Sequence, residues 1–156
     1  MIKSFNDITP KLKQVKAYDL YGINQYVQIR YKIFIKELGR PIIGEFYIDD
    51  LLAKHYILKT EHPIGTARII YKDRIAEIGR IAILKEYRNQ SYGAIIMHQI
   101  LLIIKTTERV DLIRLFVERN QGGDFNKIEF YKKFGFIENG QIFFDNQPYV
   151  NMELSL

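Results

Sequence analysis

The sequence contains no cysteine and only three histidines. Without cysteine, the chain has no disulfide framework, no thiolate nucleophile and no cysteine-ligated metal site. The histidines are His55, His62 and His98, and none of them falls in an H-x-x-H or H-E-x-x-H spacing. This argues against a zinc hydrolase, so we expect no metal cofactor.

Long uncharged apolar runs are also missing. The first residues, MIKSFNDITPKLKQ, lack the apolar core of a signal peptide, and no run approaches the roughly 20 residues that cross a bilayer. The longest apolar stretch, residues 94–105, is interrupted by His98 and Gln99 and ends at Lys105, as is typical of a buried helix. We therefore expect no membrane span and a cytoplasmic protein.

Length and charge indicate the number of domains and the kind of partner. A chain of 156 residues with 47% hydrophobic composition predicts one domain, residues 1–156, with a core of its own. The net charge of +5 is scattered along the chain rather than gathered in a basic tail. This distribution disfavours a nucleic-acid partner and favours an anionic small molecule or an acidic partner protein.

The first third of the chain predicts one strand and one long helix. Residues 14–20 alternate apolar and polar side chains, as a strand does, and residues 23–39 have the spacing of an amphipathic helix that stops at Gly39. Residues 40–53 show no period, which predicts a long loop with a short helical turn.

The remainder alternates between strand and helix patterns. Three runs rich in Ile, Tyr and Thr predict antiparallel strands at 54–60, 63–72 and 74–84, because only short turns connect them. A helix from about Ser91 to Arg109 should then lead to a parallel strand at 112–118, followed by a helix at 125–135 and a closing hairpin at 136–156. The order β-α-β-β-β-α-β-α-β-β predicts an α+β fold with a mixed, largely antiparallel sheet.

The segment RNQSYG, residues 88–93, connects a predicted strand to a predicted helix. Such a connection exposes unpaired backbone N–H groups at the positive end of the helix dipole, which is a place that binds phosphate. Gly93 permits close backbone approach, Ser91 is a candidate N-cap and Arg88 supplies a permanent cation. An ordinary solvated turn remains the alternative for this segment alone.

Two separated motifs decide between these interpretations. The stretch AEIGRIAILKEYRNQSYGAIIMHQIL resembles the acetyl-CoA-binding core of the GNAT (GCN5-related) N-acetyltransferase superfamily, with Arg88, Gly93 and Ala94 matching its pattern and Ser91 replacing its first glycine. Residues 128–136, IEFYKKFGF, are similar to the superfamily's late tyrosine motif. The resemblance implies the GNAT acyl-CoA N-acyltransferase fold.

The front half and the tail resemble one branch of that superfamily. RYKIFIKELGRPI, IDDLLAKHYIL and PIGTARI are similar to segments of the ElaA/YjcF-like branch. The tail FDNQPYVNMEL resembles that branch's ending, with Tyr149 in place of a histidine. The resemblance covers about residues 22–154 in all.

The resemblance implies direct transfer of an acetyl group from acetyl-CoA to a primary amine of a small molecule or protein, without a covalent enzyme intermediate. Asn120 stands further ahead of Tyr131 than the corresponding amide residue of the family does. Acetyl-CoA is the expected acyl donor, and the residues implied to bind it are Ile81, Ala82, Ile83, Arg88, Asn89, Gln90, Ser91, Tyr92, Gly93, Ala94 and Asn120.

The resemblance also implies the catalytic residues. Tyr131 would donate a proton to the leaving thiolate, because a phenol with a pKa of about 10 is protonated at neutral pH. Glu77 would be the general base, and it lies on the face opposite Arg80 if the strand is regular. Four further residues could instead line the acceptor pocket or relay a proton: Glu45, Asp49, Asp50 and His55.

Other functions stay open at this point. RYKIFIKELG and EIGRIAI are also similar to segments of N-acyl amino-acid and acyl-homoserine-lactone synthases, which use longer acyl thioesters and can take them from acidic acyl carrier protein. A domain that binds CoA as a sensor without catalysis is a second alternative, and a basic nucleic-acid module is the weakest. A homodimer is compatible with each of these.

Overall fold

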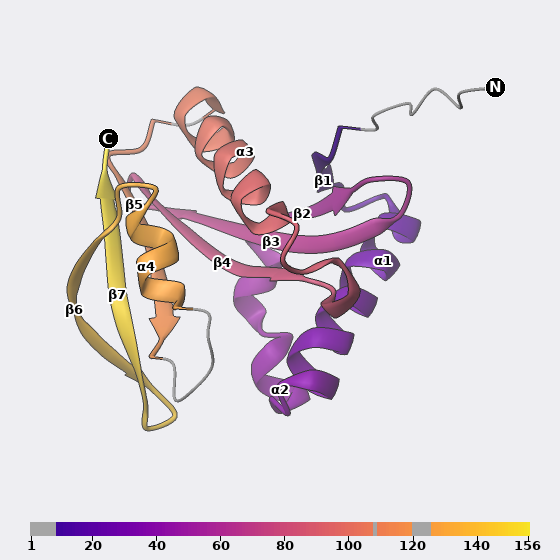
Figure 1. Cartoon of the computed structure of the whole chain (residues 1–156), viewed down its shortest axis with the longest axis horizontal. Helices are drawn as coiled ribbons and strands as arrows, with labels where there is room; N and C mark the ends of the chain where they lie inside the picture. The colour runs from indigo at the N-terminus through magenta and orange to yellow at the C-terminus, as the bar shows by residue number, and fades with distance from the viewer. Residues whose placement is uncertain (1–8, 108, 120–125) are drawn as a thin grey trace. The chain divides into compact units, whose positions relative to one another are not determined.

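The computed structural model describes residues 9–107, 109–119 and 126–156 (Figure 1). The strands are β1 (Lys11–Val15), β2 (Lys54–Lys59), β3 (Pro63–Lys72), β4 (Ile75–Ile83), β5 (Leu112–Glu118), β6 (Ile137–Phe144) and β7 (Gln147–Ser155). The α-helices are α1 (Leu20–Arg30), α2 (Ile42–Glu45), α3 (Tyr92–Thr107) and α4 (Lys127–Lys132). Three further helical segments are the π-helix η1 (Tyr31–Glu37) and the 3-10 helices η2 (Ile48–Leu51) and η3 (Lys85–Tyr87).

The predicted order of the main elements is confirmed, and two boundaries were wrong. The first strand is Lys11–Val15 rather than 14–20, because the chain turns and enters α1 at Leu20. The carboxylate of Asp19 accepts from the amide of Gly22 at 2.8 Å, and this cap starts the helix where alternation predicted a strand. Helix α4 is shorter than predicted and begins after Asn126, whose side chain accepts from the amide of Glu129.

The seven strands form one mixed sheet in the order β1-β2-β3-β4-β5-β7-β6. β4 and β5 pair in parallel, whereas β1–β2, β5–β7 and β6–β7 are antiparallel. This confirms the predicted fold class. Among the described residues, no helix has the length and apolar character needed to cross a membrane.

The chain divides into two compact units that share strands β3 and β4. The first unit contains the described residues of Met1–Arg68 and Arg80–Ile100, and the second contains those of Ile69–Gly79 and Leu101–Leu156. The single domain expected from the length of the chain stays a prediction.

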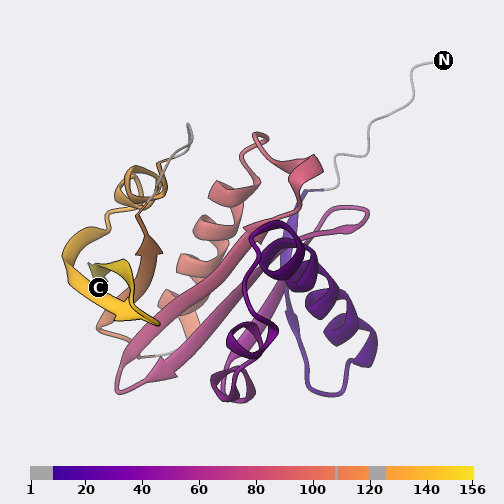
Figure 2. The same cartoon turned by 90° about the horizontal axis from the view of Figure 1, so that it is seen from below.

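In the first unit, helices cover both faces of the strands. Figures 1 and 2 show α1 and α2 on one side and the beginning of α3 on the other. Gln99 of α3 ties that helix to the first strand, since its side chain accepts from the amide of Leu12 at 2.7 Å and donates to the carbonyl of Pro10 at 2.8 Å. The core under α1 and η1 consists of Tyr26, Ile29, Ile33, Phe34, Ile57 and Leu84.

Helix α1 continues without a break into the π-helix η1. The predicted stop at Gly39 is confirmed, because Gly39 has φ +67°, a left-handed conformation that glycine adopts without steric cost. The amide of Arg40 then donates back to the carbonyl of Phe34 at 2.9 Å and closes the helix end.

The second unit is built on β5 and the hairpin β6–β7. Strand β5 buries every second residue, Ile113, Leu115 and Val117, as an alternating strand with one covered face does. The hairpin turns at Asp145 and Asn146, which have φ values of 47° and 62°. Two successive left-handed residues match the right-handed twist of the flanking strands. The closing hairpin is thus confirmed.

Candidate active site

The loop after β4 presents a row of free backbone amides. Residues 88–91 connect η3 to α3, and in the described part of the chain the amides of residues 89–94 donate to no acceptor. Asn89 and Ser91 have left-handed φ values of 61° and 62°. Left-handed residues at a helix entrance turn successive N–H groups toward one point, which makes a concave anion site. The backbone geometry therefore fits the predicted phosphate-binding loop.

Ser91 occupies the position directly before α3, where its carbonyl accepts from the amide of Ile95 at 3.1 Å. Its hydroxyl accepts from no amide in the part of the chain that the structure describes, so the side-chain cap expected from the sequence is absent there. The left-handed backbone costs a non-glycine residue about 1–2 kcal/mol. Glycine would adopt this conformation at no steric cost.

Ser91→Gly should raise the free energy of unfolding by roughly 1 kcal/mol, because glycine relieves the left-handed strain but makes the unfolded chain more flexible. Urea denaturation followed by circular dichroism measures this change. Ser91→Ala is the matched control: it removes the hydroxyl but keeps the strain, so it should bring no gain. A Ser91→Gly protein no more stable than Ser91→Ala would contradict the explanation.

Arg88 braces the same loop. Its guanidinium forms a two-point ion pair with Glu37 of η1, including Nη2 to Oε2 at 2.9 Å, and its Nε donates to the carbonyl of Ile83 at 2.9 Å. The hydrogen bond from Arg88 lowers the pKa of Glu37. Because this ion pair is partly exposed and hence weak, a phosphate could compete for the guanidinium. Phosphate binding by Arg88 stays a prediction.

The segment Ile81–Ile83 at the end of β4 follows an irregular residue. Arg80 has a left-handed φ of 53°, and its carbonyl accepts from the hydroxyl of the fully buried Thr66 at 3.0 Å. The strand is therefore not regular at Arg80, and alternation does not decide which face it occupies. Gly65 of β3 packs closely against this segment, and a larger residue would not fit there, because an added Cβ would lie 2.8 Å from the Ala82 carbonyl oxygen.

Tyr131 lies in α4, and its ring packs edge-on against Phe130 and Phe136, with centroids 5.2 Å and 6.1 Å away. Burial raises the pKa of Tyr131 to about 12. The phenol consequently keeps its proton across the whole physiological range, as an acid that protonates a thiolate must.

Glu77, the predicted base, forms an ion pair with Arg114 of the neighbouring strand β5, with Oε2 3.2 Å from Nη2. Both Glu77 and Tyr131 belong to the second unit, whereas residues 81–83 and 88–94 belong to the first. Asn120 lies outside the described residues.

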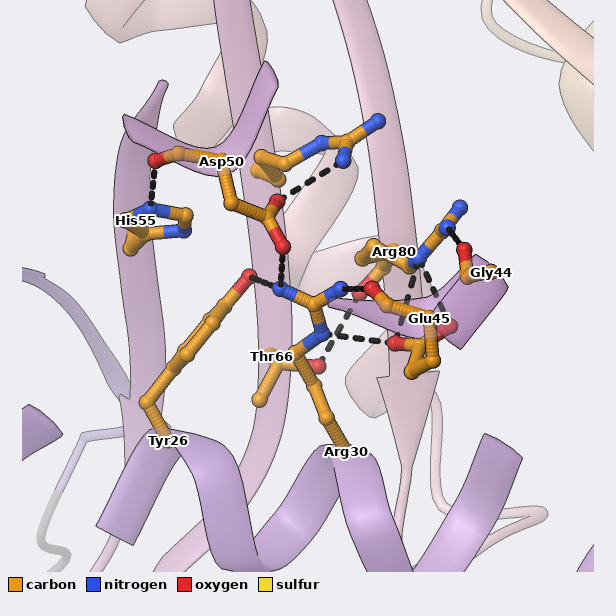
Figure 3. Close-up of polar contacts among 9 residues, drawn as sticks. Tyr26, Arg30, Gly44, Glu45, Asp50, His55, Thr66 and Arg80 are labelled. Carbon is orange, nitrogen blue, oxygen red and sulfur yellow. Dashed lines mark hydrogen bonds and ion pairs between the residues drawn. The ribbon is translucent and has the colours of Figure 1, made fainter. Parts of the chain in front are cut away.

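Glu45 and Asp50, two of the four candidates for the acceptor pocket or a proton relay, are bound to arginines (Figure 3). Arg30 lies between them: its Nε donates to Glu45 at 2.6 Å and its Nη1 donates to Asp50 at 2.9 Å. Arg68 pairs with Asp50 at 2.8 Å, and Arg80 pairs with Glu45 at 3.0 Å. We call these five residues the arginine–carboxylate cluster. All of them belong to the first unit.

The arginines of the cluster keep Asp50 ionised. Burial alone would raise the pKa of Asp50, but hydrogen bonds and positive charge from Arg68 and Arg30 outweigh it and hold that pKa below its usual value. An ionised carboxylate whose oxygens are taken by two guanidiniums is a poor general base. Asp50 therefore fits a structural role better than proton abstraction.

His55 and Asp49 are the other predicted acceptor-side residues. The His55 Nε2–H donates to the carbonyl of Asp50 at 2.7 Å, which leaves Nδ1 as a buried acceptor with no partner among the described residues. Burial lowers the pKa of His55, so the imidazole is neutral at pH 7. Asp49 is exposed on η2, directly before Asp50 in the chain.

Sequence reasoning missed the roles of Arg30 and Arg68. Arg30 lies in the motif RYKIFIKELG and Arg68 in the motif PIGTARI, and membership of these motifs was the only sequence feature that set them apart. Their partners Glu45 and Asp50 lie 15 to 20 residues away along the chain, and no local pattern joins them.

The chain is similar to known acetyltransferase sequences. Residues 52–138 match the family described as the acetyltransferase (GNAT) domain. A candidate acetyltransferase of Bacillus subtilis (strain 168) is 30% identical over 130 residues, which cover 80% of this chain and 84% of that protein.

Solved structures share the fold at low sequence identity. Escherichia coli ElaA is 20% identical, with a TM-score of 0.76 over 92% of this chain and 98% of that one. A GNAT family acetyltransferase from Elizabethkingia anophelis, crystallised with acetyl-CoA bound, is 15% identical, with a TM-score of 0.70 over 94% of this chain and 98% of that one.

Proposed function

Since the chain belongs to the GNAT acetyltransferase family and is thus an acyltransferase, we propose that it moves an acetyl group directly from acetyl-CoA to a primary amine of a small molecule or protein. The observation that carries this proposal is the loop of residues 89–94, whose amides have no acceptor in the described part of the chain. A pyrophosphate has the charge and the oxygen acceptors that such a loop lacks.

The donor would be held mainly by backbone. The pyrophosphate of acetyl-CoA would accept from the amides of Asn89, Gln90, Ser91, Tyr92, Gly93 and Ala94, and Arg88 would add a cation. The pantetheine arm and the thioester carbonyl would bind along Ile81, Ala82 and Ile83, with Asn120 as the further predicted contact. Backbone groups suit both tasks, because their dipoles are fixed before the substrate arrives.

The chemistry follows from these contacts. A neutral amine attacks the thioester carbon and forms a C–N bond, and the tetrahedral intermediate then collapses by breaking the C–S bond. The thiolate takes its proton from Tyr131, whose raised pKa keeps the phenol protonated. The amine gives up a proton to Glu77 or, through water, to the acceptor-side residues. The products are an amide and CoA.

The test is a transfer assay with acetyl-CoA and a panel of amines, in which released thiol and acetylated product are both measured. Formation of an N-acetyl product in equal amount to free CoA is the expected result. Binding of CoA without transfer to any amine would support the sensor alternative and contradict the proposal.

One observation favours a second candidate, transfer of longer acyl groups. The segment formed by α2 and η2 turns apolar side chains outward, namely Ile42, Ile43, Tyr47, Ile48, Leu51 and Leu52. A long acyl chain, delivered as its CoA thioester or by an acidic acyl carrier protein, would cover such a surface. A higher kcat/KM for octanoyl-CoA than for acetyl-CoA would establish this candidate.

The dependence of the rate on pH tests the role of Tyr131. We expect kcat/KM to rise with pH as the acceptor amine loses its proton. At pH values up to about 10, kcat/KM should show no decrease, because the acid form of Tyr131 is lost only near its raised pKa of about 12. Steady-state rates in overlapping buffers measure the profile. A falling limb near neutral or mildly basic pH would assign the acid to another group.

A further inference from the structure

The arginine–carboxylate cluster contains more positive than negative charge. Its guanidiniums are those of Arg30, Arg68 and Arg80, and its carboxylates are those of Glu45 and Asp50, so three cations face two anions. The neighbouring His55 is neutral and adds no anion. The cluster therefore carries one positive charge that no residue within it balances, and buried charge without a partner is costly.

The uncompensated donors lie on two of the three arginines. Arg30 is 1% exposed and uses all three of its nitrogens on Glu45, Asp50 and Tyr26. Arg68 is 8% exposed, yet its Nε is buried with no hydrogen-bond partner in the described part of the chain.

Arg80 stands where the cluster meets solvent. Its side chain is 21% exposed, its Nε pairs with Glu45, and its Nη2 reaches only the Gly44 carbonyl at 3.4 Å. No residue that the structure describes accepts from its Nη1. Arg68 and Arg80 thus have spare donors, one buried and one near solvent.

The surroundings of Arg80 add to the positive potential. Burial lowers the pKa of Arg80, the charge of Glu45 opposes this, and the charges of Arg68, Arg30 and Arg40 lower the pKa further. The guanidiniums of Arg40 and Arg80 lie 5.4 Å and 5.6 Å from the centre of the same Phe34 ring. An anion bound here would relieve the mutual repulsion of these cations.

Arg80 lies next in sequence to the segment proposed to bind the thioester. Arg80 directly precedes Ile81–Ile83, the segment proposed to bind the thioester, and Thr66 and Glu45 hold its main chain and its side chain in place. A ligand group bound by Arg80 would be fixed within one residue of that segment.

We propose that Arg80 binds the carboxylate of the acceptor, which is therefore an amine that carries a carboxylate, such as an amino acid. A single carboxylate balances the one surplus charge of the cluster. This inference rests on the proposed function in taking the bound molecule to be the amine acceptor.

Binding and transfer are measured separately to test it. Isothermal titration of the CoA-loaded protein compares matched pairs of amino acids and their carboxamides, such as leucine with leucinamide and glutamine with glutamine amide. We expect at least one carboxylate to bind about 30-fold more tightly than its carboxamide, as for other charged pairs of low exposure. Arg80→Gln should abolish this preference and Arg80→Lys should keep part of it. Arg74→Gln is the matched control, because Arg74 pairs with Asp111 at an exposed site of the second unit, and should leave the preference intact.

The outcomes are distinguishable. Equal binding within every pair, or a preference that survives in Arg80→Gln, overturns the carboxylate site. If Arg80→Gln does not fold, the wild-type comparison and the Arg80→Lys variant decide in its place. Acetyl transfer without any carboxylate preference overturns this inference and leaves the proposed function standing. Carboxylate binding that depends on Arg80 but is followed by no transfer supports the site and contradicts the proposed function.

Discussion

Tyr131→Phe is expected to lower kcat by about 100-fold or more while the KM for acetyl-CoA changes little. The substitution removes the hydroxyl that would protonate the leaving thiolate and keeps the ring that packs against Phe130 and Phe136. Steady-state kinetics with a saturating amine measure both constants. Because the ring contacts remain, the variant should fold, and its thermal unfolding should confirm this.

Tyr149→Phe is the matched control. It removes the same hydroxyl from β7, in the same unit, and should leave kcat within about twofold of wild type, because no step of the proposed reaction uses this phenol. If Tyr131→Phe behaves like Tyr149→Phe, water protonates the thiolate and Tyr131 is a packing residue of α4.

The elements that were predictable from the sequence are those with a strong local pattern. Strand β5 was located at its observed bounds because Ile113, Leu115 and Val117 alternate with polar residues. The end of the first helix was located because Gly39 is a residue that takes a left-handed φ at no cost. Patterns of this kind depend on neighbours a few residues apart, and they are therefore legible in one sequence.

The features that escaped prediction depend on distant residues or on unusual backbone. The left-handed conformations of Arg80 and Ser91 are unexpected for residues that have a Cβ. Arg68 meets Asp50 across 18 positions, and Arg80 meets Glu45 across 35. Charged residues in a predicted loop are usually solvated, so no local sequence pattern indicated that Glu45 would be fully buried.

The arginine–carboxylate cluster makes an asymmetric prediction about stability. Glu45→Gln should lower the free energy of unfolding by about 3–5 kcal/mol, because it leaves three guanidiniums with the single carboxylate of Asp50. Arg30→Met should cost well under ~3 kcal/mol, because Glu45 keeps Arg80, Asp50 keeps Arg68, and the methionine fills part of the same buried volume. Urea denaturation of both variants measures the difference.

The sign of this asymmetry is what the charge count predicts. Removing one anion moves the cluster from one unbalanced charge to two, whereas removing one cation brings it to balance. If the carboxylates and arginines contributed only through packing, the larger truncation, Arg30→Met, would be the more damaging, since Arg30 is among the largest fully buried side chains. Equal or reversed losses would show that the surplus charge is already balanced in the free protein, and would remove the reason for a carboxylate to bind at Arg80.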